Sequence, residues 1–135
     1  MSKEKMQEVS YGVLTWGPCI VHLKISEDFH KLLVEEANAS RVKELDYTKK
    51  LAGVIKEEYM FRKKETFLPW ISQCLGIYDE AFQKHKNVYY KPEDKPNYLL
   101  SSLWVNFMKK NEFNPPHDHS DELSFVIFLD VPPEI

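Results

Sequence analysis

Apolar and polar residues alternate in two parts of the chain, as they do in β-strands that are buried on one side. Residues 19–25 show the pattern first. Residues 123–131 repeat it near the other end, with one face formed by Leu123, Phe125, Ile127, Leu129 and Val131. Residues 98–108 are apolar on both faces, which predicts an inner strand of a sandwich. A short extended piece is expected at residues 57–61. With the strands at residues 98–108 and 123–131, strands dominate the last third of the chain.

Helical spacing of apolar residues appears in two other parts of the chain. A first helix should begin after Ser26, a suitable N-cap, and should end near residues 38–40. A longer helix is predicted from Thr66, as its cap, to about Lys84. Pro69 is compatible with that helix only in its first turn. Both apolar stripes are expected to pack into a core.

The order of these elements, helices first and strands last, predicts an α+β fold. A chain of 135 residues is long enough for one domain with a buried core. Residues 1–96 form its mostly helical part, and residues 97–135 form its strands. Between the two long helices, residues 51–55 could form a single helical turn. Before the first strand, residues 13–16 are a short apolar patch.

Composition narrows the class of protein. The net charge of −3 gives no general electrostatic reason to bind nucleic acid. No apolar run approaches the roughly 20 residues that span a bilayer, and no secretory signal is expected at the charged start of the chain. Only two cysteines occur, far apart in sequence, which favours a reducing, cytoplasmic setting.

The candidate chemistry lies in residues 114–122, immediately before the last predicted strand. In an extended segment, residues two apart point the same way, so His117 and His119 would present both imidazoles to one side. His119 and Asp121 satisfy the same geometry, which makes Asp121 an alternative to His117, and Asp118 is a weaker alternative. Either pair supplies two legs of the facial arrangement of non-haem Fe(II) oxygenases. The competing interpretation is a pair of ordinary surface histidines.

Three sequence elements also carry a resemblance. Trp104-Val105-Asn106, the run from Asn114 to His119, and the strand that begins at Leu123-Ser124 and is followed by Pro132 resemble the 2-oxoglutarate- and Fe(II)-dependent oxygenases encoded in phage and marine bacterial genomes. The resemblance covers roughly residues 97–135. It implies a double-stranded β-helix, of the jelly-roll or cupin type, with the N-terminal helices packed on it.

By this resemblance, the protein would hold Fe(II), bind 2-oxoglutarate as a small-molecule co-substrate, use O2, and release succinate and CO2 while hydroxylating a substrate. His117 and His119 occupy the metal-binding positions of the family. The pocket would be lined by Trp104, Asn106, Ser124 and Phe128, the last at a position where many relatives have tyrosine.

The family places a distal histidine ligand, and the basic residue that binds 2-oxoglutarate, on later strands. The sequence is therefore expected to be a fragment of a longer reading frame with an incomplete catalytic site. The alternative function is a non-catalytic jelly-roll binding or structural module. In either case, sheet edges left exposed would favour a homodimer, for example by strand exchange.

Overall fold

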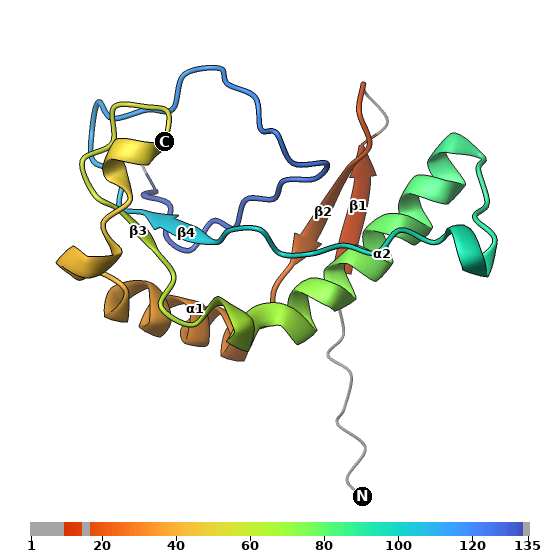
Figure 1. Cartoon of the computed structure of the whole chain (residues 1–135), viewed down its shortest axis with the longest axis horizontal. Helices are drawn as coiled ribbons and strands as arrows, with labels where there is room; N and C mark the ends of the chain where they lie inside the picture. Colours follow the sequence, from red (N-terminus) through yellow and green to blue (C-terminus); the bar gives the residue numbers. More distant parts are fainter. Residues whose placement is uncertain (1–9, 15–16, 134–135) are drawn as a thin grey trace, which may run out of the picture. The chain divides into compact units, whose positions relative to one another are not determined.

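The computed structural model describes residues 10–14 and 17–133 (Figure 1). The chain folds into two compact units. The first comprises Met1–Phe29 and Glu65–Leu99, and the second comprises His30–Lys64 and Leu100–Ile135. The described residues form two α-helices, two small antiparallel sheets and short 3₁₀ turns, which confirms the α+β class.

In the first unit, β1 (Ser10–Leu14) pairs with β2 (Ile20–Lys24), with Gly12 opposite His22. Strand β2 confirms the strand predicted at residues 19–25, because its side chains alternate between exposed and half-buried. The apolar patch at residues 13–16 overlaps β1, and residues 15 and 16 lie outside the described part of the chain.

Helix α2 (Leu68–Lys86) confirms the long predicted helix, with Pro69 in its first turn. The predicted cap is wrong: Phe67 holds the N-cap position without a side-chain hydrogen bond, because Thr66 lies in a 3₁₀ turn, η3 (Lys64–Phe67), that leads into the helix. Phe67 is buried, and the ring of Phe29 stacks on Trp70 at 4.1 Å between centroids. After the helix, a 3₁₀ turn, η4 (Pro92–Asp94), leads to Tyr98.

Helix α1 (Glu27–Ala39) begins and ends where the sequence predicts. The Ser26 hydroxyl oxygen accepts a hydrogen bond from the Phe29 N–H at 3.3 Å, so Ser26 caps the helix. In the second unit, Leu33 and Ala37 on this helix are buried.

The sheet of the second unit consists of β3 (Glu58–Met60) and β4 (Trp104–Asn106), with Glu58 opposite Asn106. Two backbone bonds, Phe61 N–H to Leu103 O and Phe107 N–H to Glu57 O, both 2.9 Å, extend it at its ends. The extended piece predicted at residues 57–61 is thus confirmed. The strand predicted at residues 98–108 is confirmed only at residues 104–106, because β3 offers only three residues for pairing.

Two 3₁₀ turns, η1 (Lys43–Leu45) and η2 (Thr48–Lys50), precede this sheet. The helical turn predicted at residues 51–55 is wrong. Residues 51–54 are bends, because the backbone there bonds across to another segment: the Val54 N–H donates to Phe113 O at 3.0 Å.

The strand predicted at residues 123–131 does not form among the described residues. Its alternation survives only as a difference in exposure: Leu123, Ile127 and Leu129 are half-buried, whereas Phe128 is 77% exposed. A strand needs a partner for its backbone groups, and no described segment pairs with this one. Its side-chain anchor is His30, whose Nε2–H donates to Leu129 O at 2.6 Å.

The described residues therefore contain two two-stranded sheets and no barrel, and the expected jelly-roll core is not shown. Within residues 10–14 and 17–133, no helix is both long enough and apolar enough to cross a membrane.

Candidate functional site

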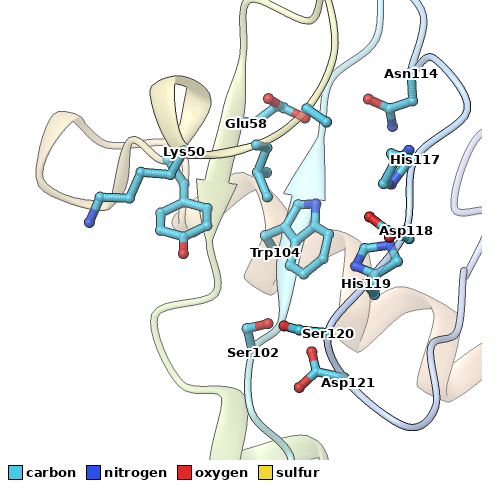
Figure 2. A pocket seen from close by; sticks show the side chains of 13 residues that line it. Lys50, Glu58, Ser102, Trp104, Asn114, His117, Asp118, His119, Ser120 and Asp121 are labelled. Carbon is cyan, nitrogen blue, oxygen red and sulfur yellow. The ribbon is translucent and has the colours of Figure 1, made fainter.

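A pocket of about 360 Å³ lies in the second unit, between its sheet and the histidine-containing stretch (Figure 2). Its lining comes from three segments that are far apart in the sequence. They are residues 47–58, residues 102–104 and residues 114–121; the lining residues are Tyr47, Lys50, Leu51, Ala52, Glu58, Ser102, Trp104, Asn114, His117, Asp118, His119, Ser120 and Asp121.

The imidazoles of His117 and His119 lie side by side, as the spacing predicts. Their ring centroids are 4.8 Å apart, the rings are inclined at 68°, and both side chains are exposed. A metal about 2.1 Å from a ring nitrogen lies roughly 3.2 Å from that ring's centroid. Two imidazoles on one metal therefore have centroids roughly 4.5–5.2 Å apart, for angles between octahedral and tetrahedral. The observed separation falls in this range.

A hydrogen bond selects the free nitrogen of His117. Its Nδ1 lies 2.8 Å from the carbonyl oxygen of Pro115. Because a carbonyl oxygen can only accept, Nδ1 carries the proton, and in the neutral ring Nε2 keeps its lone pair. Metal-binding histidines are usually held in this way, by a second hydrogen bond on the other nitrogen. The fixed φ of the two prolines before His117 stiffens this arrangement.

The opposite wall of the pocket is Trp104, on β4. Its ring centroid is 6.2 Å from that of His119, with the rings tilted by 34°. Figure 2 shows the indole between the sheet and the two imidazoles. The indole thus backs the His119 ring on one side.

The carboxylates of the stretch do not join the histidines. Asp121 Oδ2 accepts a hydrogen bond from Ser101 Oγ at 3.1 Å, and Asp118 lines the pocket. Among the described residues, no group of three or more histidine, cysteine, aspartate or glutamate side chains is placed to hold one metal ion. The structure brings two of the predicted ligands together and leaves Asp121 turned toward Ser101.

The remaining predicted pocket residues have different surroundings. Asn106 is half-buried beside Glu58 in the sheet, and its Oδ1 has no hydrogen-bond partner. Ser124 and Phe128 are both exposed, and neither is among the described residues that line the pocket. Their predicted role requires the strand at residues 123–131, which is absent from the described structure.

Sequence reasoning missed Glu58. Its side chain is 1% exposed, it lines the pocket, and its Oε1 has no hydrogen-bond partner. Burial raises the pKa of the Glu58 carboxyl above its usual value, and the charge of Glu112 raises that pKa further. The only sequence signal was a charged residue inside a short extended piece.

Its neighbour Glu57 shows the opposite environment. Glu57 Oε1 accepts hydrogen bonds from Arg41 at 2.6 and 2.9 Å, and Oε2 lies 2.9 Å from the Lys109 ammonium. Hydrogen bonds from Lys109 and Arg41 lower the pKa of Glu57. Because successive side chains of an extended segment point to opposite faces, one of these adjacent carboxylates is paired and the other faces the pocket.

The loop opposite the histidines is fixed by a glycine. Gly53 has a φ of 131°, a conformation that side-chain-bearing residues rarely adopt. A β-carbon at this position would collide with the side chain of Asn114 and would lie 3.1 Å from Phe113 O. The close approach positions the start of the stretch that carries His117.

Comparisons with protein-family models, with curated proteins and with solved structures found no match for this chain.

Proposed function

We propose that this chain is a non-haem Fe(II)- and 2-oxoglutarate-dependent oxygenase domain in which His117 and His119 bind the metal. The observation that carries the proposal is the hydrogen bond from His117 Nδ1–H to Pro115 O, at 2.8 Å, beside a second imidazole at 4.8 Å. The hydrogen bond leaves the lone pair of His117 Nε2 free. The distance between the two ring centroids suits two imidazoles on one metal.

The donor set fits a first-row divalent metal. Imidazole nitrogen is a common ligand for iron, zinc, copper and nickel, and two histidines with open positions match the incomplete facial arrangement of non-haem iron sites. Asp121 is the alternative to His117 as the second ligand, and in that role it would exchange its bond to Ser101 for the metal. When bound, the iron would supply the activation of O2 that couples oxidation of 2-oxoglutarate to hydroxylation.

The chain's own residues have roles in preparing this site. The Pro115 carbonyl keeps the proton of His117 on Nδ1, so that Nε2 stays available. Trp104 lies on one side of His119, with its ring centroid 6.2 Å from that of the imidazole. A jelly-roll core is proposed from the sequence resemblance of residues 97–135 alone, since residues 123–131 form no strand in the described structure.

The lining suits the metal better than the co-substrate. Lys50 is the basic residue among the described lining side chains, and its ammonium lies 5.3 Å from the centroid of the Tyr47 ring. Glu58, Asp118 and Asp121 also line the pocket and oppose a dianion. The proposal for 2-oxoglutarate therefore rests on the sequence resemblance.

The test is an anaerobic Co(II) titration followed by visible absorption. We expect stoichiometric binding in the wild type and its loss in His117→Ala and in His119→Ala. His22→Ala, which removes an exposed histidine of the other unit, is the matched control and should bind as the wild type does. If His117→Ala and His119→Ala both bound Co(II) as the wild type does, the metal site would be contradicted. Release of succinate from 2-oxoglutarate, with Fe(II) and O2, then tests the oxygenase activity.

A non-catalytic binding module is the second candidate, and one observation favours it: the described residues hold no third metal ligand beside the two histidines. Metal binding without succinate release, in a longer chain that also supplies a distal histidine and a basic residue, would support it. Its proposed partner is a second copy of the chain, joined through residues 123–131, where Val126 and Phe128 are each 77% exposed. Sedimentation equilibrium of the wild type and of Phe128→Ser would test this homodimer.

A cytoplasmic location completes the proposal, in keeping with the free thiols of Cys19 and Cys74.

A further inference from the structure

Two buried oxygen atoms of the second unit's sheet lack a hydrogen-bond partner. They are Glu58 Oε1 and Asn106 Oδ1. These residues are direct partners in the β3–β4 register, so their side chains stand on the same face of the sheet. Buried polar atoms are nearly always paired, and each exception in a folded protein calls for an explanation. With Glu58 ionised, both atoms are acceptors, so a group that satisfies them must be a donor. Of the two residues, Glu58 is the one that lines the pocket.

The charged residues around Glu58 indicate the charge of the donor group. Glu58, Asp118 and Asp121 line the pocket, and the charge of Glu112 also acts on Glu58. Lys50 is the basic side chain that lines the pocket among the described residues. The field in this pocket therefore favours a cation.

The neighbouring carboxylate, Glu57, has its counter-charges on the opposite face of the segment. Glu57 is paired with Arg41 and Lys109 on the other face of the same segment. No ion pair of Glu58 occurs in the part of the chain that the structure describes. A buried carboxylate normally has a counter-charge, and here the pocket is where one can enter.

We propose that the pocket binds an organic nitrogen cation, a guanidinium or a primary ammonium group, through the carboxylate of Glu58. Trp104, in the same lining, adds an aromatic wall of the kind that attracts such cations. Identifying this cation as part of the oxygenase substrate rests on the proposed function. The binding itself does not require the metal.

The experiment uses the whole chain in the presence of a chelator, with methylguanidinium as the probe. Binding is followed by NMR through the indole N–H of Trp104, assigned with Trp104→Phe. N-methylurea is the neutral probe of the same shape, and acetate is the anionic one. We expect saturable shifts with methylguanidinium, much weaker ones with N-methylurea and none with acetate. Equal binding of N-methylurea, or no binding of methylguanidinium, would overturn the proposal.

Two variants then locate the binding. Glu58→Gln keeps the shape of the side chain and should weaken methylguanidinium binding roughly 30-fold or more, the effect of removing one partner of a buried charge pair. Glu57→Gln, the adjacent and ion-paired carboxylate, should stay within about 2-fold of the wild type. Unchanged affinity in Glu58→Gln, with its fold verified by NMR, would contradict the assignment. The probe series on the wild type remains decisive if that variant does not fold.

The two proposals fail separately. Glu58→Gln should bind Co(II) as the wild type does, because Glu58 is not one of the proposed ligands. His119→Ala should lose Co(II) and keep methylguanidinium. Loss of methylguanidinium in Glu58→Gln together with unchanged Co(II) binding would assign the cation to Glu58, whereas unchanged methylguanidinium binding in Glu58→Gln would overturn this inference and leave the metal proposal intact.

Discussion

The Nδ1 atom of His117 lies 2.8 Å from the carbonyl oxygen of Pro115, two residues earlier in the chain. This bond predicts that the neutral ring of His117 is the Nδ1–H tautomer in the metal-free protein. Long-range ¹H–¹⁵N correlation spectra distinguish the two tautomers directly, and the exposed His22 provides a reference ring in the same spectrum. A proton on Nε2 of His117 would mean that the metal-binding nitrogen is not preformed.

The conformation of Gly53 predicts a destabilising substitution. Gly53→Ala should lower the free energy of unfolding by roughly 1–3 kcal/mol, because the backbone at this position is strained for alanine and its β-carbon meets Asn114. Gly12→Ala is the control, since nothing lies within 4 Å of a β-carbon there. Urea denaturation of both variants measures the difference. An equal effect of the two substitutions would show that the approach of residue 53 to Asn114 is unimportant for stability.

Glu58 and Glu57 should make the stability depend on pH in opposite ways. Burial raises the pKa of Glu58 above its ordinary 4.5, so the folded chain holds this proton more tightly than the unfolded chain does. Its unfavourable contribution is absent below that ordinary value and grows as the pH rises through the raised pKa. Glu58→Gln should therefore stabilise the protein more at neutral pH than at pH 4.

For Glu57, hydrogen bonds from Lys109 and Arg41 lower the pKa below its ordinary 4.5. The stabilisation from this carboxylate is present above the ordinary value and is lost as the pH falls through the lowered pKa. Glu57→Gln should therefore destabilise the protein at neutral pH and lose its effect in acid. Thermal unfolding of both variants between pH 3 and pH 8 gives the two signs. Curves that change in the same direction would contradict the two environments.

In the first unit, the hydroxyl of Tyr98 donates to Asp79 Oδ1 at 2.8 Å, and Asp79 is only 5% exposed. Tyr98→Phe should lower the free energy of unfolding by about 1.5–3 kcal/mol, the usual range for a hydrogen bond to a charged group. Tyr89→Phe removes the same atom from a side chain that is 73% exposed and should have an effect within about 0.5 kcal/mol. Chemical denaturation compares them, and similar losses would show that the Tyr98–Asp79 bond contributes little.

The sequence predicted what depends on neighbours along the chain. The two helices, the strand at residues 19–25, the Ser26 cap and the approach of His117 to His119 all follow from spacings of a few residues. These features depend on local periodicity and on short side-chain-to-backbone bonds, which a single sequence displays.

What depends on distant pairing could not be predicted in the same way. Glu58 is buried because β3 pairs with β4, and the charged residues around it in the sequence give no indication of that partner. Residues 123–131 show the converse: their pattern suits a strand, but alternation does not specify a partner for the backbone. The two histidines of the pocket could therefore be predicted from the sequence, whereas the buried carboxylate of Glu58 could not.

The adjacency of Glu57 and Glu58 also constrains how β3 can align with β4. A shift of the pairing by one residue would turn every side chain of β3 to the other face. It would carry Glu57 away from Arg41 and Lys109 into the interior, and it would expose Glu58. The three residue pairs and the backbone bonds at the two ends of the sheet specify the same alignment. The ion pairs of Glu57, on one face of the sheet, thus favour the register in which Glu58 faces the pocket on the other.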